Sequence, residues 1–204
     1  MRIKIYFFIM VCLIFNFEVQ AFEYKKLPIK VSFLNETVNI TPAFRFLKHP
    51  VHPGLLIGTE FLVKEKPNSD FHISSNMGFY HHKKLQNGFL LNSEIGYRYN
   101  FNFGLNLNSR FGLGYLHTFY PGEVYKQTDE GFKEITDYGK PHLLASLSIG
   151  TGYTLKSVFS NPVEIFCNYQ LLLEAPFATK LGLPFLIHYM LNIGIKFYPF
   201  TKND

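Results

Sequence analysis

Apolar and polar residues alternate one by one along most of the chain, in stretches of about ten residues separated by turn residues. The clearest stretch is Leu191–Phe197, in which large apolar side chains alternate with asparagine, glycine and lysine. Successive side chains of a strand point to opposite faces, so this pattern predicts strands with one apolar and one polar face. We expect about eight strands, in or near residues 29–46, 54–64, 71–82, 89–99, 104–115, 142–154, 163–174 and 191–197.

The first residues of the chain follow a different pattern. Arg2 and Lys4 precede an almost continuous apolar run, Ile5–Phe17, and the small residue Ala21 follows shortly after it. A basic start, a short apolar core and a small residue before the cut describe a secretory signal peptide. The run is shorter than the about 20 apolar residues of a membrane helix. We therefore expect residues 1–21 to be removed and residues 22–204 to form one domain.

Composition narrows the classes of protein that fit. The chain is 47% hydrophobic and 18% aromatic, with 23 Phe, 13 Tyr and no Trp. Cys167 is the only cysteine after the expected signal peptide, which excludes a disulfide-stabilised domain. A formal net charge of +5 without runs of lysine or arginine argues against nucleic acid as a partner.

Alternating strands fit two kinds of barrel. A soluble, lipocalin-like barrel places its apolar faces inside, and an outer-membrane barrel places them outside. Glycine, asparagine and single charges dominate the polar faces, and aromatic residues gather at strand ends, as at Tyr97–Phe103. The final Phe197–Phe200 resembles the aromatic end by which the barrel-assembly machinery recognises its substrates. We therefore expect an all-β, antiparallel transmembrane β-barrel of the outer membrane, monomeric and surrounded by lipid and lipopolysaccharide, with the soluble barrel as the alternative.

The lengths of the connections suggest an orientation. Short turns are expected near residues 65–70, 100–103 and 155–162, and these would face the periplasm. Longer loops on the outside are characteristic of outer-membrane barrels. The expected outer loops lie near residues 47–53, 83–88, 118–141 and 175–185.

Charged residues on the polar faces would share the barrel interior. Glu94 and Arg110 lie on consecutive strands and would be opposite or diagonal neighbours. Eight strands leave little open space, so we favour a plug of paired charges over an ion path. The predicted lumen charges are Glu60, Glu94, Arg98, Arg110, Glu164, Glu174 and Lys196.

Histidines and lysines gather at the predicted outer rim. Imidazoles bind zinc, copper and nickel, but no His-x-His spacing marks a preformed site, so no metal or cofactor is predicted and scattered rim histidines are the alternative. The lysines would contact lipopolysaccharide phosphates or anchor the barrel at the headgroups. The histidines are His49, His52, His81, His82, His117, His142 and His188, and the lysines are Lys48, Lys83, Lys84, Lys140 and Lys180.

One short motif suggests catalysis. His72 and Ser74 form a His-x-Ser string that resembles the motif of outer-membrane lipid A deacylases, which implies a histidine base and a serine nucleophile. The first carboxylate after this string is Glu94, too far along for a comparable spacing, and both side chains would point inward near the periplasmic end. A lipid-modifying enzyme is therefore an alternative, and no catalytic residue is predicted.

Five strings carry a family resemblance: His52–Gly54, Gly58–Phe61, Gly96–Tyr99, Gly112–Phe119 and Tyr198–Phe200. They resemble a family of small, functionally uncharacterised outer-membrane β-barrel proteins of Gram-negative bacteria. The resemblance implies the fold and the location, and it brings no catalytic residues. The leading hypothesis is a non-enzymatic barrel with a structural role or a surface interaction through its outer loops.

Overall fold

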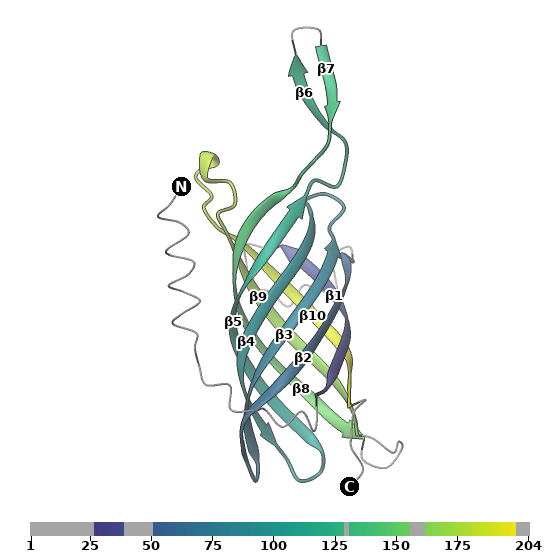
Figure 1. Ribbon diagram of the computed structural model, residues 1–204, viewed down its shortest axis with the longest axis vertical. Helices are drawn as coiled ribbons and strands as arrows, with labels where there is room; N and C mark the ends of the chain where they lie inside the picture. The colour runs from purple at the N-terminus through teal and green to yellow at the C-terminus, as the bar shows by residue number, and fades with distance from the viewer. Residues whose placement is uncertain (1–26, 39–50, 129–130, 156–161, 199–204) are drawn as a thin grey trace.

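The computed structural model describes residues 27–38, 51–128, 131–155 and 162–198 (Figure 1). The expected signal peptide, His49, Lys48 and Phe200 lie outside these ranges. Eight strands form a closed antiparallel barrel in the order β1-β10-β9-β8-β5-β4-β3-β2, which confirms the predicted fold class. The barrel strands are β1 (Ile29–Val38), β2 (Pro53–Lys66), β3 (Ser69–His81), β4 (Asn87–Asn100), β5 (Leu105–Phe119), β8 (Lys140–Leu155), β9 (Val163–Ala175) and β10 (Leu186–Phe197).

Pairing of the first and last strands closes the barrel. Ile29 lies opposite Phe197 and Val38 opposite His188, so β1 and β10 are paired along the whole of β1. Closure leaves no free strand edge in the barrel wall, which removes the usual site of edge-to-edge aggregation.

The two ends of the barrel have different connections. At one end, short turns join β2 to β3 and β4 to β5, and the last strand, β10, also ends there (Figure 1). Gly104 takes a φ of 98° in the β4–β5 turn, where a side chain would be strained. At the other end, two further strands, β6 (Val124–Thr128) and β7 (Gly131–Ile135), form a separate hairpin. We call this hairpin the ribbon, and the two ends of the barrel the terminal end and the ribbon end.

Two elements add to what the alternation predicted. The connection predicted over residues 118–141 contains the ribbon, and the last strand begins at Leu186, directly after the predicted loop 175–185 and before the alternating stretch that starts at Leu191. In the segment before Leu191, three successive residues, His188, Tyr189 and Met190, are all buried, so alternation is absent there. Pairing with β9 and β1 extends this strand in spite of its pattern.

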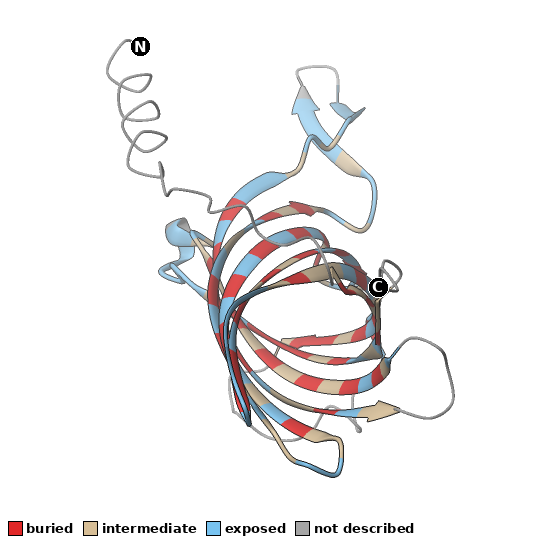
Figure 2. Cartoon of the chain, turned by 60° about the horizontal axis from the view of Figure 1, so that its bottom comes forward, coloured by how far each residue is buried: buried red, intermediate tan, exposed pale blue. Residues whose placement is uncertain are grey.

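Burial alternates along the barrel strands in the sense opposite to that of a soluble barrel (Figure 2). On β4, Leu91, Ile95 and Tyr97 face outward and are exposed, whereas Asn92 and Glu94 face inward and are buried. The polar interior and apolar exterior predicted from the alternation are therefore observed. Among the described residues, the only helix is the single turn Thr179–Leu181. No helix in this part of the chain is long and apolar enough to cross a bilayer.

One level of the lumen is apolar, which the pattern did not predict. Each barrel strand contributes one buried residue to a single cluster, which we call the apolar ring. The ring divides the interior into a polar layer toward the ribbon end and a larger polar region toward the terminal end. Its members are Leu34, Leu56, Tyr80, Leu90, Leu116, Leu144, Leu172 and Met190.

Glycine makes room for the largest member of the ring. The Tyr80 side chain lies directly over Gly88 of the neighbouring strand, where a Cβ atom would collide with the aromatic ring. Since Tyr80 is completely buried, it has no free space into which it can move. A substitution at Gly88 would therefore disturb the ring through overpacking.

Candidate functional site

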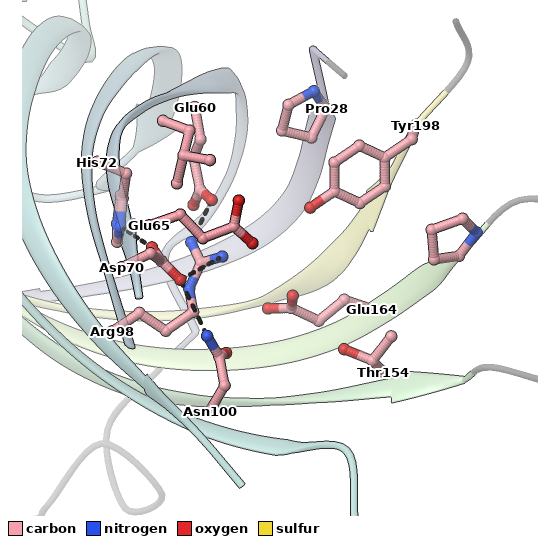
Figure 3. Close-up of a pocket in the computed structure, with 12 residues that line it drawn as sticks. Pro28, Glu60, Glu65, Asp70, His72, Arg98, Asn100, Thr154, Glu164 and Tyr198 are labelled. Carbon is pink, nitrogen blue, oxygen red and sulfur yellow. Dashed lines mark hydrogen bonds and ion pairs between the residues drawn. The ribbon is translucent and has the colours of Figure 1, made fainter. Parts of the chain in front are cut away.

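The polar layer near the terminal end is built around Glu60 (Figure 3). Its carboxylate accepts a hydrogen bond from Arg98 Nη2 and lies 3.3 Å from both Lys30 Nζ and Lys196 Nζ. Lys196 Nζ also lies 2.6 Å from Glu164 Oε2. All five side chains are nearly inaccessible to solvent, so each charge depends on its partners for stabilisation.

A second group of charges lies between this layer and the apolar ring. Glu94 Oε1 accepts hydrogen bonds of 2.9 Å from Ser146, Ser148 and Gln170. Arg110 Nε lies 3.2 Å from Glu94 Oε2, as the expected pairing of consecutive strands requires. The cavities at this level have volumes of about 10 Å³, enough for about one water molecule each.

All seven predicted lumen charges point inward, but they do not form one network. Glu174 lies on the far side of the apolar ring from Glu60, among histidines. Two inward charges of the first strand were missed, Lys30 and Glu36, because that strand was only placed within residues 29–46. Period-two counting backward from the ring position Leu34 would have identified Lys30.

A cavity of about 390 Å³ opens at the terminal end (Figure 3). Asp70, also missed by the sequence analysis, lies in its wall and accepts a hydrogen bond of 3.0 Å from Asn100. His72 Nδ1 lies 2.9 Å from Asp70 Oδ1. The cavity is lined by Pro28, Glu60, Leu62, Glu65, Asp70, His72, Arg98, Asn100, Thr154, Pro162, Glu164 and Tyr198.

The His-x-Ser motif does not assemble a catalytic triad. Asp70, two residues before His72 in the sequence, supplies an acid beside the imidazole. The sequence analysis had considered only carboxylates that follow the motif. The Ser74 hydroxyl, however, donates to Glu94 Oε2 at 3.5 Å, and His72 Nε2 has no hydrogen-bond partner. The serine is therefore bonded to a carboxylate rather than to the base that nucleophilic catalysis needs.

The ribbon-end layer is centred on His188. Its Nδ1 lies 2.8 Å from Glu36 Oε1 and its Nε2 lies 2.8 Å from Glu174 Oε2, so one imidazole joins two carboxylates. Gln86 also donates to Glu174 at 2.8 Å, and His142 Nδ1 lies 3.1 Å from the same carboxylate. Histidines are thus the basic partners of both carboxylates among the described residues of this layer.

Glu36 also lies beside a second pair of histidines. His52 Nδ1 is 2.9 Å from the backbone oxygen of Glu36, and the rings of His52 and His82 have centroids 3.6 Å apart. Glu36, His52 and His82 each offer one ligand atom within 4.8 Å of the others. Burial lowers the pKa of His82 below its ordinary value, so this imidazole is neutral at physiological pH.

The predicted histidine rim is divided by the structure. His52, His82, His142 and His188 belong to the ribbon-end layer, whereas His81 is exposed and contacts Asn87. His117 lies on the outward face of β5, where its ring nitrogens contact Tyr115 and the backbone oxygen of Tyr138. The six histidines that the structure describes therefore do not form one cluster, and the sequence analysis had not predicted that carboxylates accompany four of them.

Rim lysines and a second cavity lie at the ribbon end. Lys83, Lys84 and Lys140 are exposed there, while the side chain of Lys180 lies outside what the structure describes. A cavity of about 910 Å³ lies between the base of the ribbon and the β9–β10 connection. Its lining includes Gln86, Tyr120, Asp137, His142 and Phe177.

Sequence comparisons add nothing to these observations. No family model matches the chain. No curated protein matches it either. The family resemblance expected from the motifs is thus supported by no sequence comparison.

Solved structures of similar shape are barrels. Neisserial surface protein A aligns with a TM-score of 0.49 at 10% identity, over 84% of this chain and 94% of that one. The N-terminal β-barrel domain of Pseudomonas aeruginosa OprF gives 0.46 at 13% identity, over 84% and 96%. Ail, the attachment invasion locus protein of Yersinia pestis, gives 0.45 at 12% identity, over 85% and 99%. At these identities no residue role is transferred to this chain.

Proposed function

We propose that the protein is a monomeric, non-enzymatic outer-membrane β-barrel that interacts with partners at the cell surface through its ribbon end. The outward face of the barrel supports the location. Phe33, Ile95 and Leu143 are 66–75% exposed on three different strands, in a wall whose outward positions are mostly apolar. Such a surface is unfavourable in water and fits the hydrocarbon of a bilayer.

The interior argues against the soluble, lipocalin-like alternative. Lys196 and Glu94 are almost completely buried inside the barrel, and Glu174 is completely buried. A soluble barrel has no reason to bury charges while it exposes phenylalanine and leucine. Lipid on the outside accounts for both features.

The apolar ring supports a lumen that does not conduct ions. Eight buried side chains, one from each strand, fill one cross-section between the two polar layers. An ion crossing this level would lose its hydration and find no polar ligand, at a cost of many kcal/mol. The ring is therefore stronger support for a closed lumen, without an ion path, than the charge pairs alone.

The ribbon is the single observation that carries the interaction role. It is a two-stranded hairpin outside the barrel (Figure 1), and every residue of β7 is exposed. Phe132 and Tyr138 are 77% and 84% exposed, although they lie outside the apolar belt of the wall. Exposed aromatic residues on a protruding element are characteristic of binding surfaces. Lys83, Lys84 and Lys140 at the same end would contact lipopolysaccharide phosphates.

The location and the orientation are tested on intact cells. Membrane-extracted protein should migrate differently on a gel before and after boiling, as folded outer-membrane barrels do. Trypsin added to intact cells should cleave the ribbon at Lys126 or Lys133 and leave the barrel intact. Recovery in the soluble periplasm would overturn the location, and cleavage only after the cells are opened would reverse the orientation.

The interaction role is tested with a photoactivatable residue at Phe132. Irradiation of intact cells with their natural surroundings should give a discrete cross-linked product. The matched control carries the same residue at Leu113, which faces outward in the wall and should cross-link only to lipid. Products from Leu113 alone would contradict the role of the ribbon.

The absence of catalysis is tested on lipid A. Mass spectra of lipid A from cells with and without the protein should be identical. A change in acylation that disappears in the His72→Ala variant would establish the lipid-modifying enzyme instead. Planar-bilayer recordings of the folded protein should likewise show no steady conductance.

A further inference from the structure

Three side chains that are distant in sequence meet at the ribbon end of the lumen. Glu36 lies near the end of β1, His52 directly precedes β2, and His82 directly follows β3. β1 pairs with β2 and β2 pairs with β3 in the wall, so this pairing brings the three residues together. Each offers one ligand atom within 4.8 Å of the others, and Glu36 and His52 are buried.

The carboxylate of Glu36 has one oxygen in use and one free. Oε1 lies 2.8 Å from His188 Nδ1, which holds the side chain in place. Oε2 is buried, has no hydrogen-bond partner and faces His52, whose Nδ1 is 3.7 Å away. A buried carboxylate oxygen without a partner is costly, and a bound cation would remove that cost.

His52 has one ring nitrogen available to a metal ion. Its Nδ1 donates to the backbone oxygen of Glu36 over 2.9 Å, because a carbonyl oxygen can only accept. The proton is therefore on Nδ1, and Nε2 carries the free electron pair. Most metal-binding histidines are held in this way by a carbonyl or a carboxylate on the other ring nitrogen.

His82 needs one local change to bind a metal. Its Nδ1 accepts from the backbone N–H groups of Leu85, at 3.0 Å, and Lys84, at 3.3 Å. Coordination through Nε2 moves the ring proton to Nδ1 and breaks these two contacts. Lys84 is exposed and Leu85 partly exposed, so water can replace the lost acceptor.

We propose that Glu36, His52 and His82 form a binding site for one divalent transition-metal ion of the zinc class. Two imidazoles and one carboxylate are the donors that Zn²⁺ prefers, whereas Ca²⁺ and Mg²⁺ require mostly oxygen. Three protein ligands leave a fourth position for water. The ion would tie together the ribbon ends of three neighbouring strands.

The site is tested by zinc titration of the untagged protein folded in detergent, in competition with a chromophoric chelator. One Zn²⁺ per chain should bind, and Ca²⁺ or Mg²⁺ should not compete. E36Q, H52Q and H82Q should each weaken the affinity by at least about 10- to 100-fold. The matched controls are H81Q, an exposed neighbour of His82, and H142Q, a buried histidine of the same layer outside the proposed site; both should leave the affinity unchanged.

Folding of each variant is checked by its heat-modifiable gel shift. If a variant does not fold, Co²⁺ bound to the wild-type protein gives an independent result, since a four-coordinate site with nitrogen ligands has intense visible bands. Absence of these bands, absence of micromolar zinc binding, or an equal loss of affinity in H81Q would each overturn the proposal.

Discussion

The two polar layers of the lumen differ in how completely their charges are paired. Near the terminal end, Lys30, Arg98 and Lys196 are paired with Glu60, Glu164 and Asp70, so three cations face three carboxylates. At the ribbon end, histidines are the partners of Glu36 and Glu174, and Glu36 Oε2 remains without a hydrogen bond. Each charged side chain of the first layer lies beside an opposite charge, whereas the second layer has a buried carboxylate oxygen available to a ligand.

The largest effect is expected from Glu60→Gln, which leaves three buried cations without their common partner. Removal of one member of a buried ion pair costs about 3–5 kcal/mol. The urea midpoint of unfolding, followed by the heat-modifiable gel shift, should fall accordingly. Glu65→Gln is the control, because Glu65 lines the same cavity but is exposed. Equal midpoints for both variants would show that the terminal-end layer does not support the barrel.

The apolar ring between the layers should be nearly as sensitive. Leu116→Ala removes a side chain that is 1% exposed and leaves a cavity, so we expect a loss of about 2–5 kcal/mol in the free energy of unfolding. Leu113→Ala, on the outward face of the same strand, should cost less because lipid fills the space. The same urea titration measures both, and a larger loss for Leu113→Ala would contradict the ring as the core of the lumen.

Bound zinc should raise the free energy of unfolding of the barrel, and this effect should depend only on the ribbon-end layer. At a free concentration of 100 times its dissociation constant, a bound ion adds about 2.7 kcal/mol to the free energy of unfolding. The wild type should gain this stability, and E36Q, whose affinity for zinc is at least about 10-fold weaker, should gain at most about 1.4 kcal/mol. Glu60→Gln should keep the full gain in spite of its lower starting stability. If Glu60→Gln also lost the gain, the two layers would be coupled rather than independent.

The smallest effect on the barrel is expected at the base of the ribbon. Hydrogen bonds from the backbone N–H groups of Tyr120 and Gly139 lower the pKa of Asp137. Since the ionised form is the one stabilised, this clamp is present above about pH 4 and is lost as the pH falls through the lowered pKa. Asp137→Ala should change barrel stability by no more than about 0.5 kcal/mol.

The same substitution should be visible in the ribbon itself. Trypsin should cleave Asp137→Ala faster than wild type at neutral pH. Glu134→Ala, an exposed change on β7, should be cleaved at the wild-type rate. Unchanged cleavage of Asp137→Ala would mean that the clamp does not hold the ribbon.

Much of the candidate site was accessible from sequence, with specific gaps. The inward positions of Glu94 and Arg110 followed from strict alternation and one short turn. Glu36 was missed because its strand was placed only within residues 29–46. Asp70 was missed because its strand was predicted to begin at residue 71. The apolar ring was missed because leucines such as Leu90 and Leu116 interrupt the polar face and look like errors in the alternation.

The sequence by itself determined the number of barrel strands, the faces of those strands and the division into short and long connections, because each depends on local alternation and turn residues. Only the tertiary structure decided which inward side chains share a level, because closure staggers neighbouring strands. That stagger unites eight apolar side chains into one ring and brings Glu36, His52 and His82 together from three separate segments. It also separates Glu174 from the charges with which it had been grouped.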